Sequence, residues 1–189
     1  MARGDQILAA LKYQLSTALA YINTKYSGTA PDVVSTRVYH IEPFDPTKEE
    51  DFSPLMGSTN YAVVITNFDG VTDGDYPTDY LKIRFTCDII LIRKTLKVKD
   101  RTNDRNLLSF GGTDDAGNTV TSIERLTNAL QKWFRTYSQG GKLPNSSAVQ
   151  TVTSCDIPEI EKLANTGDFY YKVCKFQCLT FESTAISAT

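Results

Sequence analysis

Histidine is nearly missing from this sequence, since His40 is the only one among 189 residues. Histidine is the usual general base and metal ligand near neutral pH. Its scarcity therefore argues against most acid–base catalytic sites and most metal sites. A Ser-His-Asp triad needs only one histidine, but no G-x-S-x-G elbow accompanies His40. We therefore interpret His40 as a structural or surface residue. The alternative is a small hydrolase that uses His40 with a carboxylate from a loop.

Cysteine is also scarce, and its spacing does not suit a metal site. The four cysteines form no C-x-x-C pair. Cys174 and Cys178 lie four residues apart in a predicted strand, which separates them by about 13 Å at the usual rise per residue. A chain with this many core residues does not require disulfide staples. We expect reduced, buried thiols.

Loops that bind nucleotides or calcium are lacking as well. The glycine pair 111–112 is not followed by the lysine and hydroxyl residue of a phosphate loop. The segment 69–75 superficially resembles a calcium loop, but it lacks the terminal glutamate. The carboxylates of 49–51 and 114–115 lie in predicted loops, outside the dry surroundings that acid–base catalysis needs. The sequence therefore predicts no enzyme activity, no cofactor, no metal site and no small-molecule substrate.

Long apolar runs are missing too. No segment approaches the roughly 20 apolar residues of a membrane-spanning helix, and the first residues lack the apolar core of a secretory signal. Twenty basic and 22 acidic side chains leave a formal charge of −2, which argues against a protein that coats duplex DNA. The 41% hydrophobic content suits one core. We expect a single domain over 1–189, made in the cytoplasm, with no membrane partner.

Two helices are indicated by apolar residues at intervals of three and four. The first spans about 5–25 and ends before Gly28 and Pro31. The second begins where 121–124 has the S/T-x-x-E spacing of a capping box, and it continues to Tyr137. Each helix carries one apolar stripe, which predicts packing against a common partner.

Strands are predicted near 33–41, 61–68, 81–92, 148–157 and 169–181. The strand at 81–92 alternates most clearly: one face is apolar throughout, while the other turns apolar at Ile90 and Ile92. We expect a helix or another subunit to cover that end. The order of elements predicts an α+β fold, a mainly antiparallel β-sheet with two principal helices packed on one face.

The segment 42–60 is predicted to be a long loop, and loops of this length are uncommon in compact domains unless they are functional or disordered. Its apolar residues are Phe44, Phe52, Leu55 and Met56. Such side chains would be exposed unless another chain covered them. A solvated surface excursion is the alternative.

The segment 93–121 is predicted to be a projecting β-hairpin followed by a flexible loop. It opens with six cations in thirteen residues: Arg93, Lys94, Lys97, Lys99, Arg101 and Arg105. These cations could meet phosphates or an acidic protein surface. No aromatic residue lies among them to stack on bases, and a solvated hairpin is the other interpretation.

In the order and length of these elements, from Asp5 to about Phe181, the chain resembles tail terminator (tail completion) proteins of tailed bacteriophages. The resemblance rests on no signature motif. It implies a virion structural protein that forms a ring, usually a hexamer, which caps the tail tube and offers a surface to the capsid neck. The implied partners are copies of the chain, the tail tube protein and a neck or connector protein, and DNA would pass through the ring.

The candidates for subunit or partner contacts are therefore the apolar and basic residues of the two long connections, together with Ile90 and Ile92. Two alternatives stay open. The chain could be another head-to-tail connector of the neck. It could also be a nucleic-acid-binding accessory module that uses the basic hairpin.

Overall fold

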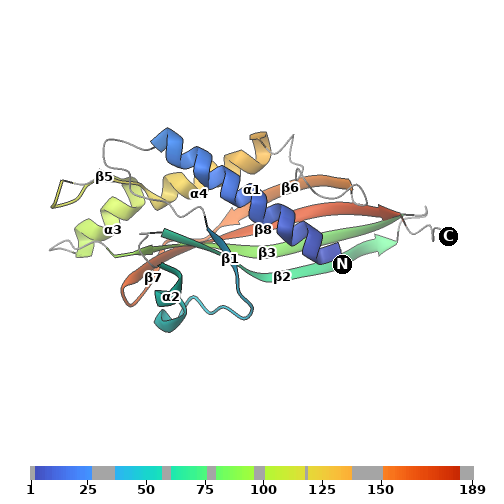
Figure 1. Ribbon diagram of the computed structural model, residues 1–189, viewed down its shortest axis with the longest axis horizontal. Coiled ribbons are helices and arrows are strands. Elements are labelled where there is room, and N and C mark those ends of the chain that lie inside the picture. The colour runs from blue at the N-terminus through green and yellow to red at the C-terminus, as the bar shows by residue number, and fades with distance from the viewer. Residues whose placement is uncertain are drawn as a thin grey trace.

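The computed structural model describes residues 3–26, 37–56, 61–75, 80–95, 101–117, 119–137 and 151–183. Its centre is a six-stranded sheet in the order β1-β2-β3-β8-β6, with β7 paired to β8 (Figure 1). The strands are β1 (Val38–His40), β2 (Tyr61–Asp75), β3 (Tyr80–Lys94), β6 (Thr151–Ile160), β7 (Ala164–Thr166) and β8 (Phe169–Ser183). All pairings are antiparallel except that of β1 with β2. The expected α+β class is confirmed.

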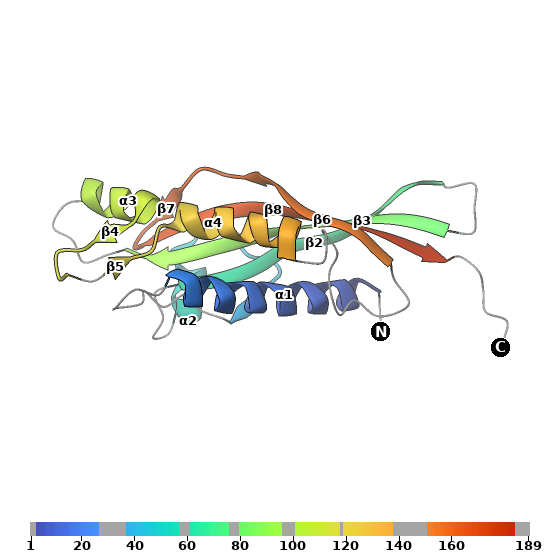
Figure 2. The same ribbon diagram turned by 90° about the horizontal axis from the view of Figure 1, so that it is seen from above.

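One face of the sheet is covered by the two long helices. α1 (Arg3–Tyr26) and α4 (Ile123–Lys132) lie along this face, and α4 continues as a π-helical turn over Trp133–Tyr137 (Figure 2). The predicted stripe of α1 is buried, as is that of α4. Both stripes pack on the uniformly apolar face of β3, and the buried residues of β3 there are Phe85, Cys87, Ile89 and Leu91.

The opposite face is covered by the segment 42–56 of the same chain. It forms a 3-10 turn at Glu49–Asp51 and a short helix, α2 (Ser53–Met56). Its four apolar residues are 0–9% exposed and pack against Ile90 and Ile92. The expectation that they would be exposed unless another chain covered them was therefore wrong. The segment folds back on the sheet, and these side chains are covered by residues of the same chain. The cover predicted over Ile90 is supplied within the chain.

Phe52 is at the centre of this second core. Its ring centroid lies 5.4 Å from that of Phe44, 5.3 Å from that of Phe169 and 5.9 Å from that of Tyr171. The end of β7 also holds the segment, because the Oγ1 hydroxyl of Thr166 donates to the Pro46 carbonyl at 2.9 Å. Four aromatic rings and a hydrogen bond thus fix the segment on the sheet.

The region after β3 differs from the prediction. The expected hairpin is a helix, α3 (Arg101–Phe110), and it is followed by the small ribbon of β4 (Gly112–Thr113) and β5 (Thr119–Val120). Asp104, Leu107 and Leu108 share one face of α3 and are buried, which is the spacing of a packed helix. α3 ends where Gly111 takes φ 78° and its N–H donates to the Leu107 carbonyl at 2.7 Å.

β2 is longer than predicted, because the turn expected at Asp69 and Gly70 does not form. A bulge between Thr66 and Asp69, with Asn67 at φ 53°, lets the strand continue. Gly70 is required there, since a Cβ at this position would lie 2.7 Å from the ring of Phe85. The first part of the strand predicted at 33–41 lies outside the described residues, as do 57–60.

We predict that Phe52→Ala lowers the free energy of unfolding by about 3–5 kcal/mol, because it empties the centre of the second core. Urea denaturation followed by circular dichroism measures this. Glu50→Ala, on the exposed 3-10 turn of the same segment, is the matched control and should change stability by less than about 0.5 kcal/mol. Equal effects of the two substitutions would contradict the packing described for 42–56.

Candidate functional site

The residues predicted to form interfaces divide into a buried and an exposed set. The four apolar residues of 42–56, with Ile90 and Ile92, are buried inside the chain, so they do not form an exposed surface. Arg93 is also buried, at 1% exposed. Lys97 and Lys99 lie outside the described residues. Lys94 and Arg105 are exposed, and Arg101 is the first residue of α3.

Arg93 is buried beside Tyr61, so its guanidinium is not accessible to a phosphate. Its guanidinium carbon is 4.7 Å from the ring centroid of Tyr61, a cation–π contact that is stronger when shielded from water. The Tyr61 hydroxyl donates to the Thr121 carbonyl at 2.6 Å. Arg93 therefore serves the fold, and the predicted basic cluster is smaller than the sequence suggested.

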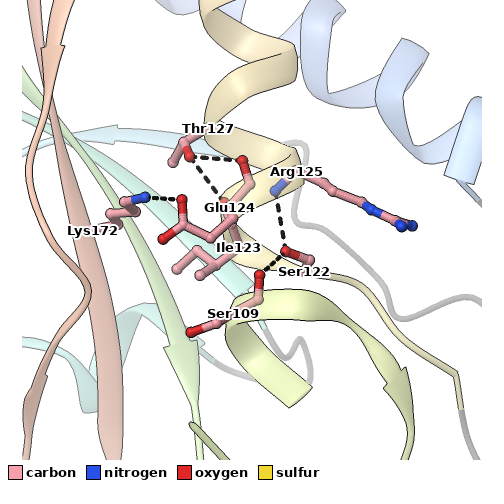
Figure 3. Close-up of polar contacts among 7 residues, drawn as sticks. All are labelled: Ser109, Ser122, Ile123, Glu124, Arg125, Thr127 and Lys172. Atoms are coloured by element: carbon pink, nitrogen blue, oxygen red, sulfur yellow. Dashed lines mark hydrogen bonds and ion pairs between the residues drawn. The ribbon is translucent and has the colours of Figure 1, made fainter. Parts of the chain in front are cut away.

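A polar cluster joins α3, α4 and β8 at the N-terminus of α4 (Figure 3). Ser122 caps α4: its hydroxyl accepts from the Arg125 N–H at 3.2 Å and donates to the Ser109 carbonyl of α3. The capping box predicted for 121–124 does not form, because Ser122 and not Thr121 is the cap and the third residue after it is Arg125. Glu124 is then free of the capping role and forms an ion pair with Lys172 of β8.

The ion pair between Glu124 and Lys172 is partly buried. The Lys172 side chain is 6% exposed and that of Glu124 is 38% exposed. Lys172 lies opposite Leu91 on the helix-covered face of the sheet, where an unpaired ammonium would be costly. Glu124 also lies in the first turn of α4, where the helix dipole favours a negative charge. The cluster therefore fixes α4 on the sheet.

His40 has one polar partner among the described residues. Its Nε2 lies 3.5 Å from Glu42 Oε1, and the same oxygen accepts the Phe68 N–H at 2.9 Å. The other oxygen of Glu42 accepts from the Thr66 hydroxyl at 3.3 Å. The structure therefore places His40 beside a carboxylate of the segment 42–56, as the hydrolase alternative requires, and in the described part of the chain no hydrogen bond joins His40 to a serine or cysteine nucleophile.

A chain of polar contacts crosses the sheet beside the segment 42–56. Asn67 donates to Asp88 at 2.7 Å, and Lys175 lies 2.9 Å from Asp88 and 3.1 Å from Glu161. Burial lowers the pKa of Lys175, but its hydrogen bonds to Asp88 and Glu161 outweigh burial and raise it. The contacts link β2, β3 and β8, and we interpret them as cross-strand stabilisation.

All four cysteines are free and buried on the helix-covered face. Burial raises the pKa of Cys174 to about 12 and, with the charge of Cys155 nearby, that of Cys178 to about 12. Burial also raises the pKa of Cys87. Thiols of this kind are protonated near neutral pH and are poor nucleophiles and ligands. The expected reduced, buried state is what the structure shows.

In the described ranges no three His, Cys, Asp or Glu side chains are placed to hold a metal ion. The segment 69–75, which superficially resembles a calcium loop, is part of β2. No helix within those ranges is both long and apolar enough to span a membrane.

No family model matches the chain, and no curated protein sequence matches it either. The functional argument therefore depends on the order of elements and on the exposed surfaces of the chain itself.

Two exposed apolar residues were missed by the sequence interpretation. Phe110, the last residue of α3, is 74% exposed, and Val71 of β2 is 57% exposed. Both lie in segments that we expected to be loops. The spacing of apolar residues there did not indicate whether either side chain would face the core or the solvent. They become candidates only because α3 and the second half of β2 are regular elements.

We predict that Glu124→Gln lowers the free energy of unfolding by about 1–3 kcal/mol, because it leaves the buried Lys172 ammonium without its charged partner. In a Lys172→Met background the same substitution should cost less, since no buried charge remains. A double-mutant cycle in urea measures the coupling. Strictly additive losses would show that the ion pair does not stabilise α4 on the sheet.

We predict that the folded chain resists alkylation by iodoacetamide at pH 8. The raised pKa values leave few thiolates, so labelling should be at least about 100-fold slower than in guanidinium chloride. A thiol whose pKa rises on folding stabilises the fold below its unfolded pKa of about 9. This contribution should be lost as pH rises from about 9 toward 12. Rapid labelling of the folded chain, measured by mass spectrometry, would contradict the burial.

Proposed function

We propose that this chain is a virion structural protein, a tail terminator whose copies form a ring that caps the tail tube and joins it to the capsid neck. The observation that carries the proposal is the order of elements. A long N-terminal helix, a long segment before β2, the extended strand β3, the capped helix α4 and the closing strands β6, β7 and β8 follow one another in the order on which the resemblance rests. The projecting basic hairpin of that resemblance is replaced here by the helix α3.

The distribution of surfaces also supports an assembly role. Among the described residues, His40 lies 3.5 Å from Glu42, and the four cysteines are buried. What the described residues do offer is two strongly exposed apolar side chains, Phe110 at the end of α3 and Val71 on β2. Surfaces of this kind suit contacts with other protein chains.

Another connector subunit of the neck has the same physical requirements and is the alternative within this class. A nucleic-acid-binding module is less favoured, because Arg93 is buried and the expected hairpin is a packed helix. Its remaining support is Phe110, an exposed aromatic on the same helix as Arg101 and Arg105, since exposed aromatics can stack on bases.

We predict that the purified chain, alone or with tail tube protein, forms a closed oligomer. Size-exclusion chromatography with light scattering should give a discrete mass, six times that of the 21.0 kDa chain for a hexamer, and electron microscopy should show rings. A chain that stays monomeric and does not bind tail tube protein would overturn the proposal. Binding to DNA that falls steeply with salt, without any oligomer, would favour the nucleic-acid module.

A further inference from the structure

Both faces of the sheet are covered near its middle, so neighbours must meet its edges or its ends. β1 pairs with β2 only at Val63–Ile65, and the outer edge of β2 continues without a partner strand in the described chain. Side chains occupy backbone donors along it: Glu42 accepts the Phe68 N–H, and Asp69 accepts the Gly70 N–H at 2.8 Å. With the bulge at Asn67, these contacts interrupt any added ladder.

The other edge strand, β6, is interrupted in the same way. Pro158 has no N–H to donate, and the pairing with β8 shifts between Asp156 and Glu159. The Ile157 N–H donates to Asp156 at 2.8 Å, while its carbonyl accepts from Gln131 at 2.6 Å. A strand from another copy would meet a broken row of backbone groups on either edge. Strand addition is therefore disfavoured, and the ends remain.

One end, which we call the α3 end, consists of α3, β4 and β5, beyond the last residues of β3 (Figures 1 and 2). Its most exposed apolar side chain is Phe110. Lys94 and Arg105 are exposed cations there, and Asp115 of the β4–β5 loop is an exposed acid. Aromatic residues and arginine are both enriched in interface hot spots.

The opposite end, which we call the sheet end, is where β2, β3 and β8 run past the N-terminus of α1 (Figure 2). Val71, Arg84 and Leu179 occupy neighbouring positions across three strands. They share the face that 42–56 covers further along, but that segment does not reach here. Val71 is exposed and Leu179 is half-buried. Asp69, two residues before Val71 on the same strand, is an exposed acid.

The two ends are too far apart to meet within one chain. Arg84 lies opposite Val71, and the ten residue-to-residue steps of β3 from Arg84 to Lys94 span about 33 Å. A contact between an α3 end and a sheet end therefore joins two copies through different surfaces. Such a heterologous contact produces a closed ring when the rotation between copies is right, and a filament when it is not.

We propose that copies of this chain associate head to tail, with Phe110 of one copy packed on Val71 and Leu179 of the next, and Arg105 paired with Asp69. The apolar residues supply the buried area, and the opposite charges set the orientation. Lys82 and Arg84, the cations at the sheet end, already interact within their own chain. The inference rests on the proposed ring and names the surfaces that close it.

The test uses the full chain and compares oligomers by light scattering over a concentration series. Phe110→Ser and Val71→Asp should each raise the concentration needed for assembly at least tenfold, with unchanged circular dichroism. Tyr13→Ser is the matched control, since Tyr13 is 55% exposed on α1, away from both ends, and it should assemble normally. Arg105→Asp and Asp69→Arg should each weaken assembly, and their combination should restore it.

The outcomes separate the interface from the function. If the wild-type chain forms rings and Phe110→Ser and Val71→Asp leave them intact, the head-to-tail contact is wrong while the ring stands. If the wild-type chain is monomeric even with tail tube protein, both proposals fail. If Phe110→Ser leaves the oligomer intact but weakens binding to single-stranded DNA, Phe110 stacks on bases and the contact is again wrong.

Discussion

β3 and β8 are paired without interruption from Tyr80↔Ser183 to Lys94↔Phe169, and the other elements depend on this pair. At the end near Ile90 and Val173 both of its faces are apolar and need cover. α1 and α4 cover one face, and 42–56 covers the other. At the opposite end the outer face is polar apart from a few residues, so it can face water. The pair thus determines which regions are core and which remain exposed.

Charged groups inside this arrangement fix its geometry more than they stabilise it. Lys172 of β8 and Arg93 of β3 both lie on the helix-covered face of this pair. Lys172 forms an ion pair with Glu124, and Arg93 lies on the ring of Tyr61. A buried ion pair contributes little net stability, but a buried charge that loses its partner is costly. Conformations that separate the two groups are therefore disfavoured. Since Glu124 belongs to α4, and Tyr61 reaches the backbone just before it, the start of α4 has one position on the sheet. α3, joined through Ser109, follows it.

The elements that could be predicted from the sequence are those in which one spacing of apolar residues, helical or alternating, continues along the whole element. The stripe of α1 and the alternation of β3 were sufficient for both elements and for the α+β class. α3 was missed because only Asp104, Leu107 and Leu108 are buried and the rest of the helix is polar apart from Phe110, its exposed last residue. The burial of Phe52 could not be predicted, because isolated apolar residues in a loop do not show which surface they contact. The candidate surface at Phe110 depends on the helix α3, and that at Val71 depends on the continuation of β2 past Gly70; neither the helix nor the continuation was predicted.

The turn between β7 and β8 has a consequence for how the chain opens. Gly167 has φ 53°, and the carboxylate of Glu49 occupies the space that a Cβ would fill. The next residue, Asp168, donates its N–H to the same carboxylate at 3.3 Å. The segment 42–56 and this turn therefore cannot loosen separately. We expect their amides to share one opening free energy in hydrogen exchange, as a single cooperative unit built from parts about 120 residues apart in sequence.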